Sequence, residues 1–250
     1  MSSSDGASGE LRHLDISDLE RGERFRTAGY GGSVSDSLAA LGIRDTVLSP
    51  SFRPLVPDSI LVGRAVTVKI HSQVGGMEAA EEAEPVDLEN HPQRRLMQAI
   101  DDAEDGTILC FDCGGDSQPA HFGELSCQLA QAHGCRGLLL AGYCRDTRYV
   151  AAMKGFSVFS FGTRPNAFGG WSITEVNTPI FLPGHLTHYV RVNPGDFVFA
   201  DLDGAQIIPE RAVDEVLLRV EDIFMTENEQ RKKLAAGMSI EDVYREYGVL

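Results

Sequence analysis

Arg145 and Asp146, two adjacent residues of opposite charge, have the clearest capacity for chemistry in this sequence. A planar guanidinium holds an oxyanion through forked hydrogen bonds, and a carboxylate supplies a hard oxygen ligand for magnesium or manganese. Together the two groups could stabilise an enolate. The alternative is that the pair only caps the helix that follows and makes surface ion pairs. The two residue types alone do not decide between these interpretations.

The elements predicted around this pair place it at the edge of a sheet. Thr107 to Phe111 is a short apolar run that leads into Gly114-Gly115, which predicts a buried strand entering a glycine loop. The apolar spacing from Phe122 to His133 predicts a helix, and Gly137 to Ala141 predicts a second buried strand. A strand-helix-strand unit has parallel strands, so the loops that leave both strands emerge at one edge, where α/β sheets bind ligands.

The start of the predicted helix meets the Arg145-Asp146 pair at that edge. The first-turn amides of a helix favour an anion such as a carboxylate, and here they belong to Leu125 and Ser126, after Gly123-Glu124. A helix start, a glycine loop and a charged pair at one edge raise the functional interpretation to about equal weight with the capping interpretation.

The pattern of strands and helices continues and predicts an α/β fold with consecutive parallel crossovers and flanking helices. A helix from Thr147 to Lys154 leads to a strand from Ser157 to Phe161, and Gly63 to Ile70 alternates as a strand does. Short links after Pro179 predict antiparallel neighbours. These later strands span 180–182, 185–192 and 197–200, and further helices span 16–28, 33–41, 210–234 and 239–247. Gly29 to Ser33 is predicted to be a turn.

These elements divide the chain into three parts. Residues 1–28 form a polar and helical N-terminal extension, residues 29–209 form the α/β domain, and residues 210–250 form a C-terminal helical extension that packs on the same or a neighbouring subunit. The segment from Gly75 to Asn90 carries six acidic residues and is predicted to be a solvated loop.

Charge and composition narrow the possible partners and the compartment. The chain has 22 basic and 37 acidic residues, a formal net charge of −15, which argues against nucleic acid and anionic membranes as partners. It lacks a secretory signal and an apolar stretch long enough to span a bilayer. Five cysteines, an odd count, predict free thiols in a reducing compartment, so we expect a cytoplasmic protein.

Several spaced blocks of the sequence resemble one known family. Gly123-Glu-Leu, then twenty positions between Glu124 and Arg145-Asp146, is similar to the family of 4-hydroxy-4-methyl-2-oxoglutarate aldolases and RraA-like proteins. The resemblance covers about residues 30 to 250, and several blocks in order are more specific than one motif. The other blocks are Gly63 to Val68, Val158 to Gly162, Pro194 to Asp196, Ala200 to Gly204 and Ile207 to Pro209.

The resemblance implies a swivelling β/β/α-type fold, a homotrimer or dimer of trimers, and a lyase that uses magnesium or manganese. Such an enzyme forms a pyruvate enolate. It would cleave 4-hydroxy-2-oxo acids, decarboxylate oxaloacetate, or do both, because the same enolate forms in each reaction.

The resemblance also implies a role for each site residue. Asp146 would bind the metal, Arg145 would bind the keto oxygen and stabilise the enolate, and Glu124 would hold a metal-bound water. The helix start at Gly123, with the amides of Leu125 and Ser126, would bind the pyruvate carboxylate. Glu227, on the C-terminal helix, would reach the metal of a neighbouring subunit.

One alternative function and two further groups of residues remain. RraA-like members of the family include regulators that bind a ribonuclease, but a regulator needs no metal-water ligand, and this chain keeps Glu124 with Arg145 and Asp146.

His121 is interpreted as a solvated loop histidine rather than a proton donor. Cys110 and Cys113 have zinc spacing without a second cysteine pair, so they are interpreted as structural thiols.

Overall fold

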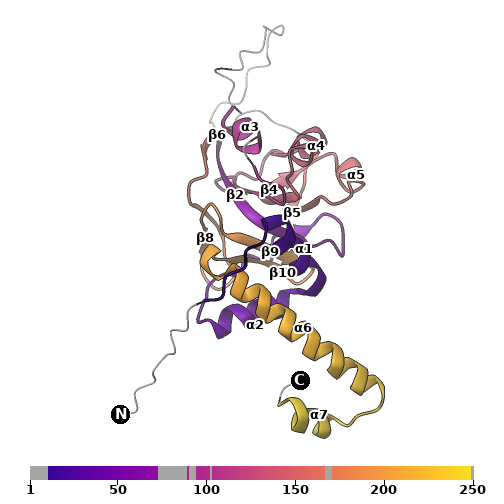
Figure 1. The fold of residues 1–250 in the computed structure, drawn as a ribbon. Helices are drawn as coiled ribbons and strands as arrows, with labels where there is room; N and C mark the ends of the chain where they lie inside the picture. The colour runs from indigo at the N-terminus through magenta and orange to yellow at the C-terminus, as the bar shows by residue number, and fades with distance from the viewer. Residues whose placement is uncertain (1–10, 73–88, 90–93, 102, 167–170, 249–250) are drawn as a thin grey trace.

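A mixed sheet of eight strands forms the centre of the described chain (Figure 1). The structure is a computed structural model that describes residues 11–72, 89, 94–101, 103–166 and 171–248. The acidic segment from Gly75 to Asn90 lies outside the described residues except for Glu89, so its prediction as a loop stands as a prediction.

Four parallel strands form the middle of the sheet, as the strand-helix-strand pattern predicted. They are β2 (Leu61–Ser72), β3 (Ile108–Asp112), β4 (Gly137–Cys144) and β5 (Ser157–Thr163). Antiparallel strands complete the order β1-β5-β4-β3-β2-β9-β10, with β6 also paired to β2, and β7 and β8 form a separate hairpin. These strands are β1 (Arg53–Pro54), β6 (Trp171–Val176), β7 (Ile180–Pro183), β8 (Tyr189–Val192), β9 (Phe197–Asp201) and β10 (Gly204–Ile208).

The parallel strands are buried on both faces, and alternate residues face two different layers. Leu138 and Leu140 of β4 belong to a core formed with α3 (Arg94–Asp101) and α4 (Glu124–Ala132). Leu139, between them, belongs to a second core formed with the β7–β8 hairpin and with β9 and β10. Burial on both faces explains why these strands are continuous apolar runs. The result is a β/β/α layering, in agreement with the predicted fold class.

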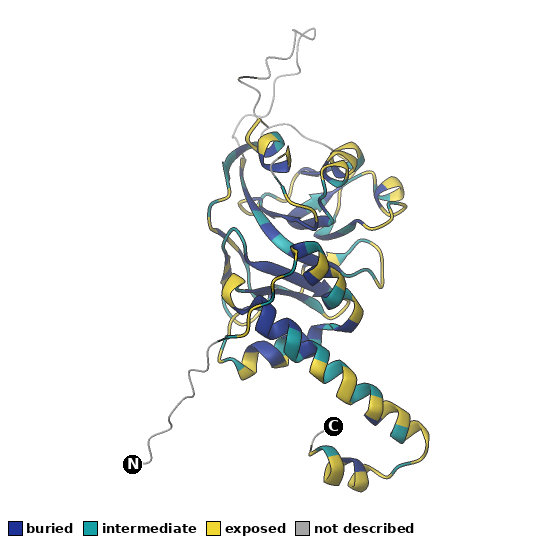
Figure 2. Cartoon of the chain, in the orientation of Figure 1, coloured by how far each residue is buried: buried dark blue, intermediate teal, exposed yellow. Residues whose placement is uncertain are grey.

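A third core joins the sheet to the helices at the other end of the molecule. It includes Phe25 of α1 (Asp18–Ala28), Val34 of α2 (Gly31–Ala40) and Val216 of α6 (Val213–Ala235), packed on Phe197 and Phe199 of β9. The 3₁₀ turn Glu210–Ala212 leads into α6. The far half of α6 and α7 (Ile240–Tyr247) extend away from the sheet and are largely exposed (Figures 1 and 2). Within the described residues, no helix combines the length and the apolar character needed to cross a membrane.

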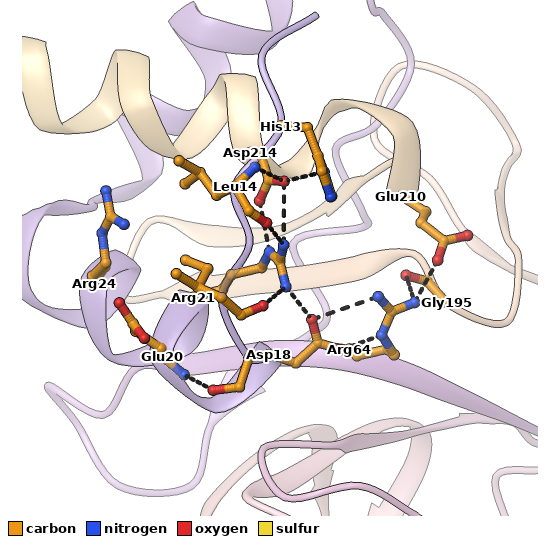
Figure 3. A network of polar contacts seen from close by, with 12 residues as sticks. His13, Leu14, Asp18, Glu20, Arg21, Arg24, Arg64, Gly195, Glu210 and Asp214 are labelled. Carbon is orange, nitrogen blue, oxygen red and sulfur yellow. Dashed lines mark hydrogen bonds and ion pairs between the residues drawn. The ribbon is translucent and has the colours of Figure 1, made fainter.

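A buried ion network fastens α1 to the start of α6 and to β2 (Figure 3). Arg21 of α1 donates from Nε to Asp214 of α6 at 2.6 Å and from Nη1 to Asp18 at 3.1 Å. Asp18 also accepts from Arg64 of β2, which donates in turn to Glu210 at 2.6 Å. The N-terminal helix is therefore tied to the same chain's C-terminal helix by charge as well as by apolar packing.

Three predictions about individual elements were wrong. The segment from Gly29 to Ser33 is not only a turn, because α2 begins at Gly31. The strand predicted from residue 185 begins only at Tyr189, and His185 and His188 are exposed in the link between β7 and β8. The helix predicted over 147–154 is the single turn α5, Thr147–Val150.

Candidate functional site

The segment before α4 continues the sheet pattern next to the end of β4. Phe122 forms a parallel bridge with Cys144, and the Arg145 amide donates to the Phe122 carbonyl at 2.9 Å. One step earlier, the His121 amide donates to the Tyr143 carbonyl at 2.8 Å. This short parallel ladder, and not helix packing alone, fixes where α4 begins relative to the residues after β4.

Three of the predicted site residues meet where this ladder ends. Asp146 Oδ2 accepts the backbone N–H of Glu124, the first residue of α4, at 3.1 Å, and it lies 3.5 Å from Arg145 Nε. Asp146 has a left-handed backbone with φ of 58°, a conformation that, after glycine, aspartate and asparagine tolerate best. The structure thus brings Glu124, Arg145 and Asp146 together.

Gly123 is what allows this close approach. A Cβ atom at Gly123 would lie 2.7 Å from Asp146 Oδ2 and 3.0 Å from Arg145 Nε, so these side chains would have to shift. Gly123 is the residue before α4 and has an extended backbone, so the need for glycine comes from crowding rather than from backbone conformation. Gly123 contributes to the site by leaving room for the side chains of Asp146 and Arg145.

The start of α4 has the features of an anion site. In a helix the first-turn amides have no intrahelical acceptor, and Asp146 takes only that of Glu124. The next two belong to Leu125, whose residue is 77% exposed, and Ser126, which is also exposed. The carboxylate of Glu124 accepts from the Gln128 side chain one turn later. The amides of Leu125 and Ser126 therefore belong to solvent-exposed residues at the start of the helix.

The oxygen donors at this edge suit a magnesium or manganese ion. The side chains of Arg145 and Asp146 are 40% and 42% exposed, so water and a substrate can share a metal with the Asp146 carboxylate. Within the part of the chain that the structure describes, no cluster of three or more histidine, cysteine or acidic side chains could form an all-protein metal cage. Magnesium is commonly held by one or two carboxylates, with water and substrate completing its shell, and Asp146 with Glu124 fits that pattern.

Glu227 is not brought to this edge within the chain. It lies on α6, at the opposite end of the molecule from α4 (Figure 1). Its carboxylate accepts from the Tyr30 hydroxyl and from Arg231 at 2.5 Å. Burial, followed by the bond to Glu227, raises the pKa of Tyr30 to about 12. The predicted role of Glu227 at a neighbouring subunit's metal remains a prediction.

His121 differs from its predicted role as a solvated residue. Its side chain is buried, Nδ1 accepts from the Tyr143 amide at 3.4 Å, and Nε2 lies 3.5 Å from Asp116 Oδ2. Burial lowers the pKa of His121, and Asp116 opposes that shift only in part. The histidine links the loop after β3 to the end of β4, a role that depends on the parallel ladder and has no local sequence signal.

Sequence reasoning also missed Arg164, which follows the last residue of β5. Its guanidinium carbon lies 3.9 Å from the centre of the Tyr143 ring, and its amide donates to the Cys144 carbonyl at 2.9 Å. The only available signal was an arginine three residues after the predicted strand from Ser157 to Phe161.

The prediction of free thiols is confirmed, because all five cysteines are free and buried.

Comparisons with known proteins agree with this fold. A family model described as RraA-like, Aldolase/RraA, matches residues 32–207. A protein of Halalkalibacterium halodurans named "Putative 4-hydroxy-4-methyl-2-oxoglutarate aldolase" is 29% identical over 184 residues, 74% of this chain and 74% of that protein.

Two solved structures show the same fold at low identity. An uncharacterized protein from Pseudomonas syringae pv. tomato has a TM-score of 0.70 and 21% identity, covering 92% of this chain and 99% of that chain. RraAS2 of Streptomyces coelicolor, described as an unusual member of the RNase ES inhibitor RraA protein family, has a TM-score of 0.67 and 21% identity, covering 86% and 98%. The family model matches residues 32–207, which is more than half of the chain, so the chain belongs to the RraA-like family.

Proposed function

We propose that this chain is a divalent-metal-dependent lyase that forms a pyruvate enolate, cleaving 4-hydroxy-2-oxo acids, decarboxylating oxaloacetate, or both. One observation carries the proposal. The Asp146 carboxylate lies 3.1 Å from the first amide of α4 and next to the Arg145 guanidinium. An anion-binding helix start, a cation and an oxygen ligand therefore share one exposed edge of the sheet.

The chain's own groups can bind and orient a 2-oxo acid at this edge. The amides of Leu125 and Ser126 donate to the substrate carboxylate, and the Arg145 guanidinium donates to the keto oxygen. Holding the carboxylate and the keto oxygen of the pyruvate half fixes the bond to be broken relative to Arg145, which lowers the entropic part of the barrier.

A magnesium or manganese ion would be held by Asp146 directly and by Glu124 through a water. When bound, it would act as a Lewis acid toward the 2-oxo group. Asp146 is suited to this because its bond to the Glu124 amide fixes the orientation of the carboxylate. Glu124 is the residue whose backbone amide Asp146 accepts, so the Glu124 side chain starts beside the Asp146 carboxylate.

In aldol cleavage, the bond between C3 and C4 of the substrate breaks, and its electron pair becomes the enolate of pyruvate. The C4 hydroxyl loses its proton to a water held by Glu124, and C4 leaves as a carbonyl. Arg145 stabilises the negative charge on the enolate oxygen, and a proton returned to C3 gives pyruvate. Decarboxylation forms the same enolate, with carbon dioxide as the other product.

We also propose that the protein assembles as a homotrimer or a dimer of trimers, in which Glu227 approaches the site of a neighbouring subunit. The extended half of α6 and α7 supports assembly because it exposes Met225, Ile240 and Tyr244, which are 61%, 63% and 50% exposed. Light scattering coupled to size-exclusion chromatography tests this proposal, and a monomer at micromolar concentration would contradict it.

Binding of a ribonuclease is the other function we considered. The solved RraA structures are similar to this chain at 21% to 22% identity, a likeness that shows the fold alone. Nothing in the geometry of the described residues favours ribonuclease binding, whereas the arrangement of Glu124, Arg145 and Asp146 favours catalysis.

The decisive experiment measures pyruvate release from 4-hydroxy-2-oxo acids and from oxaloacetate, with magnesium, with manganese and with a chelator. Exchange of the pyruvate methyl protons with deuterium oxide, followed by NMR, reports enolate formation separately. We expect metal-dependent exchange and turnover, both lost in Asp146→Ala. If neither substrate turns over, or if Asp146→Ala keeps full activity, the proposed function is wrong.

A further inference from the structure

A ladder of hydrogen bonds joins the segment before α4 to the end of β4, and His121 forms its first rung. The His121 amide donates to the Tyr143 carbonyl at 2.8 Å, and two residues later the Arg145 amide donates back to the same segment at 2.9 Å. The ladder ends where Asp146 accepts the Glu124 amide at 3.1 Å. The placement of the proposed site residues against α4 therefore depends on this short ladder.

The side chain of His121 makes a second bond in the same rung. Its Nδ1 atom accepts from the Tyr143 amide at 3.4 Å, so the two residues exchange one backbone bond and one imidazole bond. The ring lies against Gly142, where a Cβ atom would be 2.7 Å from Nδ1 and 3.0 Å from Cε1. A ring nitrogen that accepts from an amide carries no proton, so the neutral ring has its proton on Nε2.

The Nε2 side of the ring faces the loop after β3. Nε2 lies 3.5 Å from Asp116 Oδ2, and the side chains of His121 and Asp116 are 0% and 10% exposed. The other oxygen, Asp116 Oδ1, accepts from the Gln118 amide at 2.9 Å, which fixes the carboxylate within its loop. The imidazole therefore connects the loop after β3 to the ladder that carries Arg145.

Protonation of His121 is incompatible with this arrangement. A second N–H, on Nδ1, would point at the Tyr143 amide, and two donors cannot form a hydrogen bond with each other. Burial lowers the pKa of His121, and Asp116 opposes that shift only in part, so the neutral ring is favoured. The other titratable neighbour is Cys113, whose sulfur would lie 2.9 Å from the same Cβ position at Gly142. Burial raises the pKa of Cys113 well above its ordinary value, so it is a neutral thiol.

We propose that His121, as the neutral ring with its proton on Nε2, is a positioning residue that sets Arg145 and Asp146 against the start of α4, and that protonation of this ring misplaces them. The inference rests on the proposed function, because it concerns the placement of the groups that would bind and cleave the substrate. In this role His121 acts through the backbone of Tyr143 and not by contact with the substrate. A histidine then sets the acid limit of activity, in addition to the carboxylates of the site.

The first test is independent of activity. NMR of the imidazole nitrogens in histidine-labelled protein, between pH 7.5 and 4.5, reports the tautomer and the protonation of each ring, and His121→Asn identifies the His121 signals. We expect a neutral ring with its proton on Nε2 at pH 7.5, which is protonated only below the ordinary histidine value of about 6.5. A ring with its proton on Nδ1, or a charged ring at pH 7.5, would overturn the proposal.

The second test follows exchange of the pyruvate methyl protons with deuterium oxide, with magnesium present, over the same pH range. The wild-type rate should fall as the pH drops through the pKa of His121, because the rung then loses its imidazole bond. His121→Leu has no acceptor for the Tyr143 amide, so kcat at pH 7.5 should fall about 10- to 100-fold, the scale expected for a displacement of about 1 Å in a site.

His121→Asn provides the conservative rescue. Its amide oxygen can replace Nδ1 as the acceptor but cannot be protonated in this pH range. We expect a higher kcat than in His121→Leu at pH 7.5, and we expect the fall in rate that follows the pKa of His121 to be absent. A residue that only filled space would give neither the rescue nor the change in pH profile.

His133→Asn is the matched control. His133 also lies beside a carboxylate, with Nδ1 3.1 Å from Asp101 Oδ1, but it is the C-cap of α4, at the other end of the helix from Glu124. Removing this ring should leave the rate at pH 7.5 and the pH profile as they are in the wild-type protein.

The outcomes separate this inference from the proposed function. If the wild-type protein catalyses exchange and His121→Asn keeps the same pH profile, the role of His121 is overturned and the lyase stands. A profile that changes in His133→Asn instead also overturns it, because a different histidine would then set the acid limit. If the wild-type protein exchanges no pyruvate protons at any pH, the proposed function is rejected, and the role of His121 with it.

Discussion

Asp146 caps the helix that begins at Glu124, across 22 positions of sequence, through a bond of 3.1 Å between its carboxylate and the Glu124 amide. We propose that the same carboxylate is also the direct ligand of the metal. One side chain therefore fixes the start of α4 and has a part in the proposed chemistry. The two roles can be separated by substitution. Asp146→Asn keeps a side-chain oxygen for the helix cap but removes the charge, whereas Asp146→Ala removes both.

Asp146→Asn should abolish most activity while the fold is kept. Asparagine retains a side-chain oxygen that can accept from the Glu124 amide and tolerates the left-handed backbone, but it loses the negative charge. Since a metal supplies several kcal/mol of transition-state stabilisation, we expect kcat/KM for pyruvate release to fall at least about 100-fold. The melting temperature should change little. Asp146→Ala, which loses the cap as well, should also be less stable by about 1 kcal/mol. Wild-type turnover in Asp146→Asn would remove Asp146 from the chemistry.

Gly123→Ala should impair activity more than stability. The added Cβ would meet Asp146 Oδ2 at 2.7 Å and Arg145 Nε at 3.0 Å, and both are side-chain atoms that can move away. A displacement of about 1 Å in a catalytic group can cost about 100-fold in rate, so a loss of that order is expected in a steady-state assay.

Gly22→Ala is the control for this substitution. Gly22 lies inside α1, where a Cβ would meet only the Val62 carbonyl at an ordinary 3.6 Å. Alanine should stabilise the helix by up to about 1 kcal/mol and leave the rate unchanged. If Gly123→Ala is as active as Gly22→Ala, the crowding between Gly123 and Asp146 has no catalytic importance.

The parallel unit could be predicted from sequence because its signals are local. Apolar runs such as Leu138 to Ala141, buried on both faces, and the glycine that ends a helix can be identified without knowledge of their partners. The same residues carried the resemblance to the family. β10 (Gly204–Ile208) was missed, and the structure identifies it by its antiparallel pairing with β9.

The internal arrangement of the site could not be predicted, since it depends on pairing between distant segments. β4 continues to Cys144, beyond the predicted end at Ala141, and only this extension lets Phe122 pair with Cys144. The helix cap by Asp146, the burial of His121 and the stacking of Arg164 all follow from that ladder. Sequence identified the residues that we propose for the chemistry, and the tertiary pairing determines how they face one another.

Arg21→Met should be the most destabilising of the substitutions considered. Removing this guanidinium leaves the buried carboxylates of Asp18 and Asp214 without their shared partner, and breaking a buried ion pair on one side costs about 3 to 5 kcal/mol. Arg26→Met, on the same helix, removes only a pair with the exposed Glu23 and should cost at most about 1 kcal/mol. Urea unfolding measures both, and similar midpoints for the two variants would show that the network adds no stability.

Stability should fall in acid through the carboxylates at the start of α6. The bond from Arg12, with Arg219 adding to it, lowers the pKa of Glu215 to about 2. Burial opposes ionisation of Asp214, but Arg21 outweighs it and lowers the pKa of Asp214 as well. A carboxyl group in the unfolded chain titrates near about 4, so the unfolded state binds protons first as the pH drops.

The contribution of both groups is therefore complete above about pH 4.5 and is lost progressively as the pH falls toward about 2. Urea unfolding at pH 7, 4.5 and 3 should show a smaller change in the free energy of unfolding between the first two values than between the last two. Glu215→Gln has no charge to titrate, so its loss between pH 4.5 and 3 should be smaller than that of the wild-type protein. Equal losses in the two proteins would mean that Arg12 and Glu215 do not stabilise the fold through their charges.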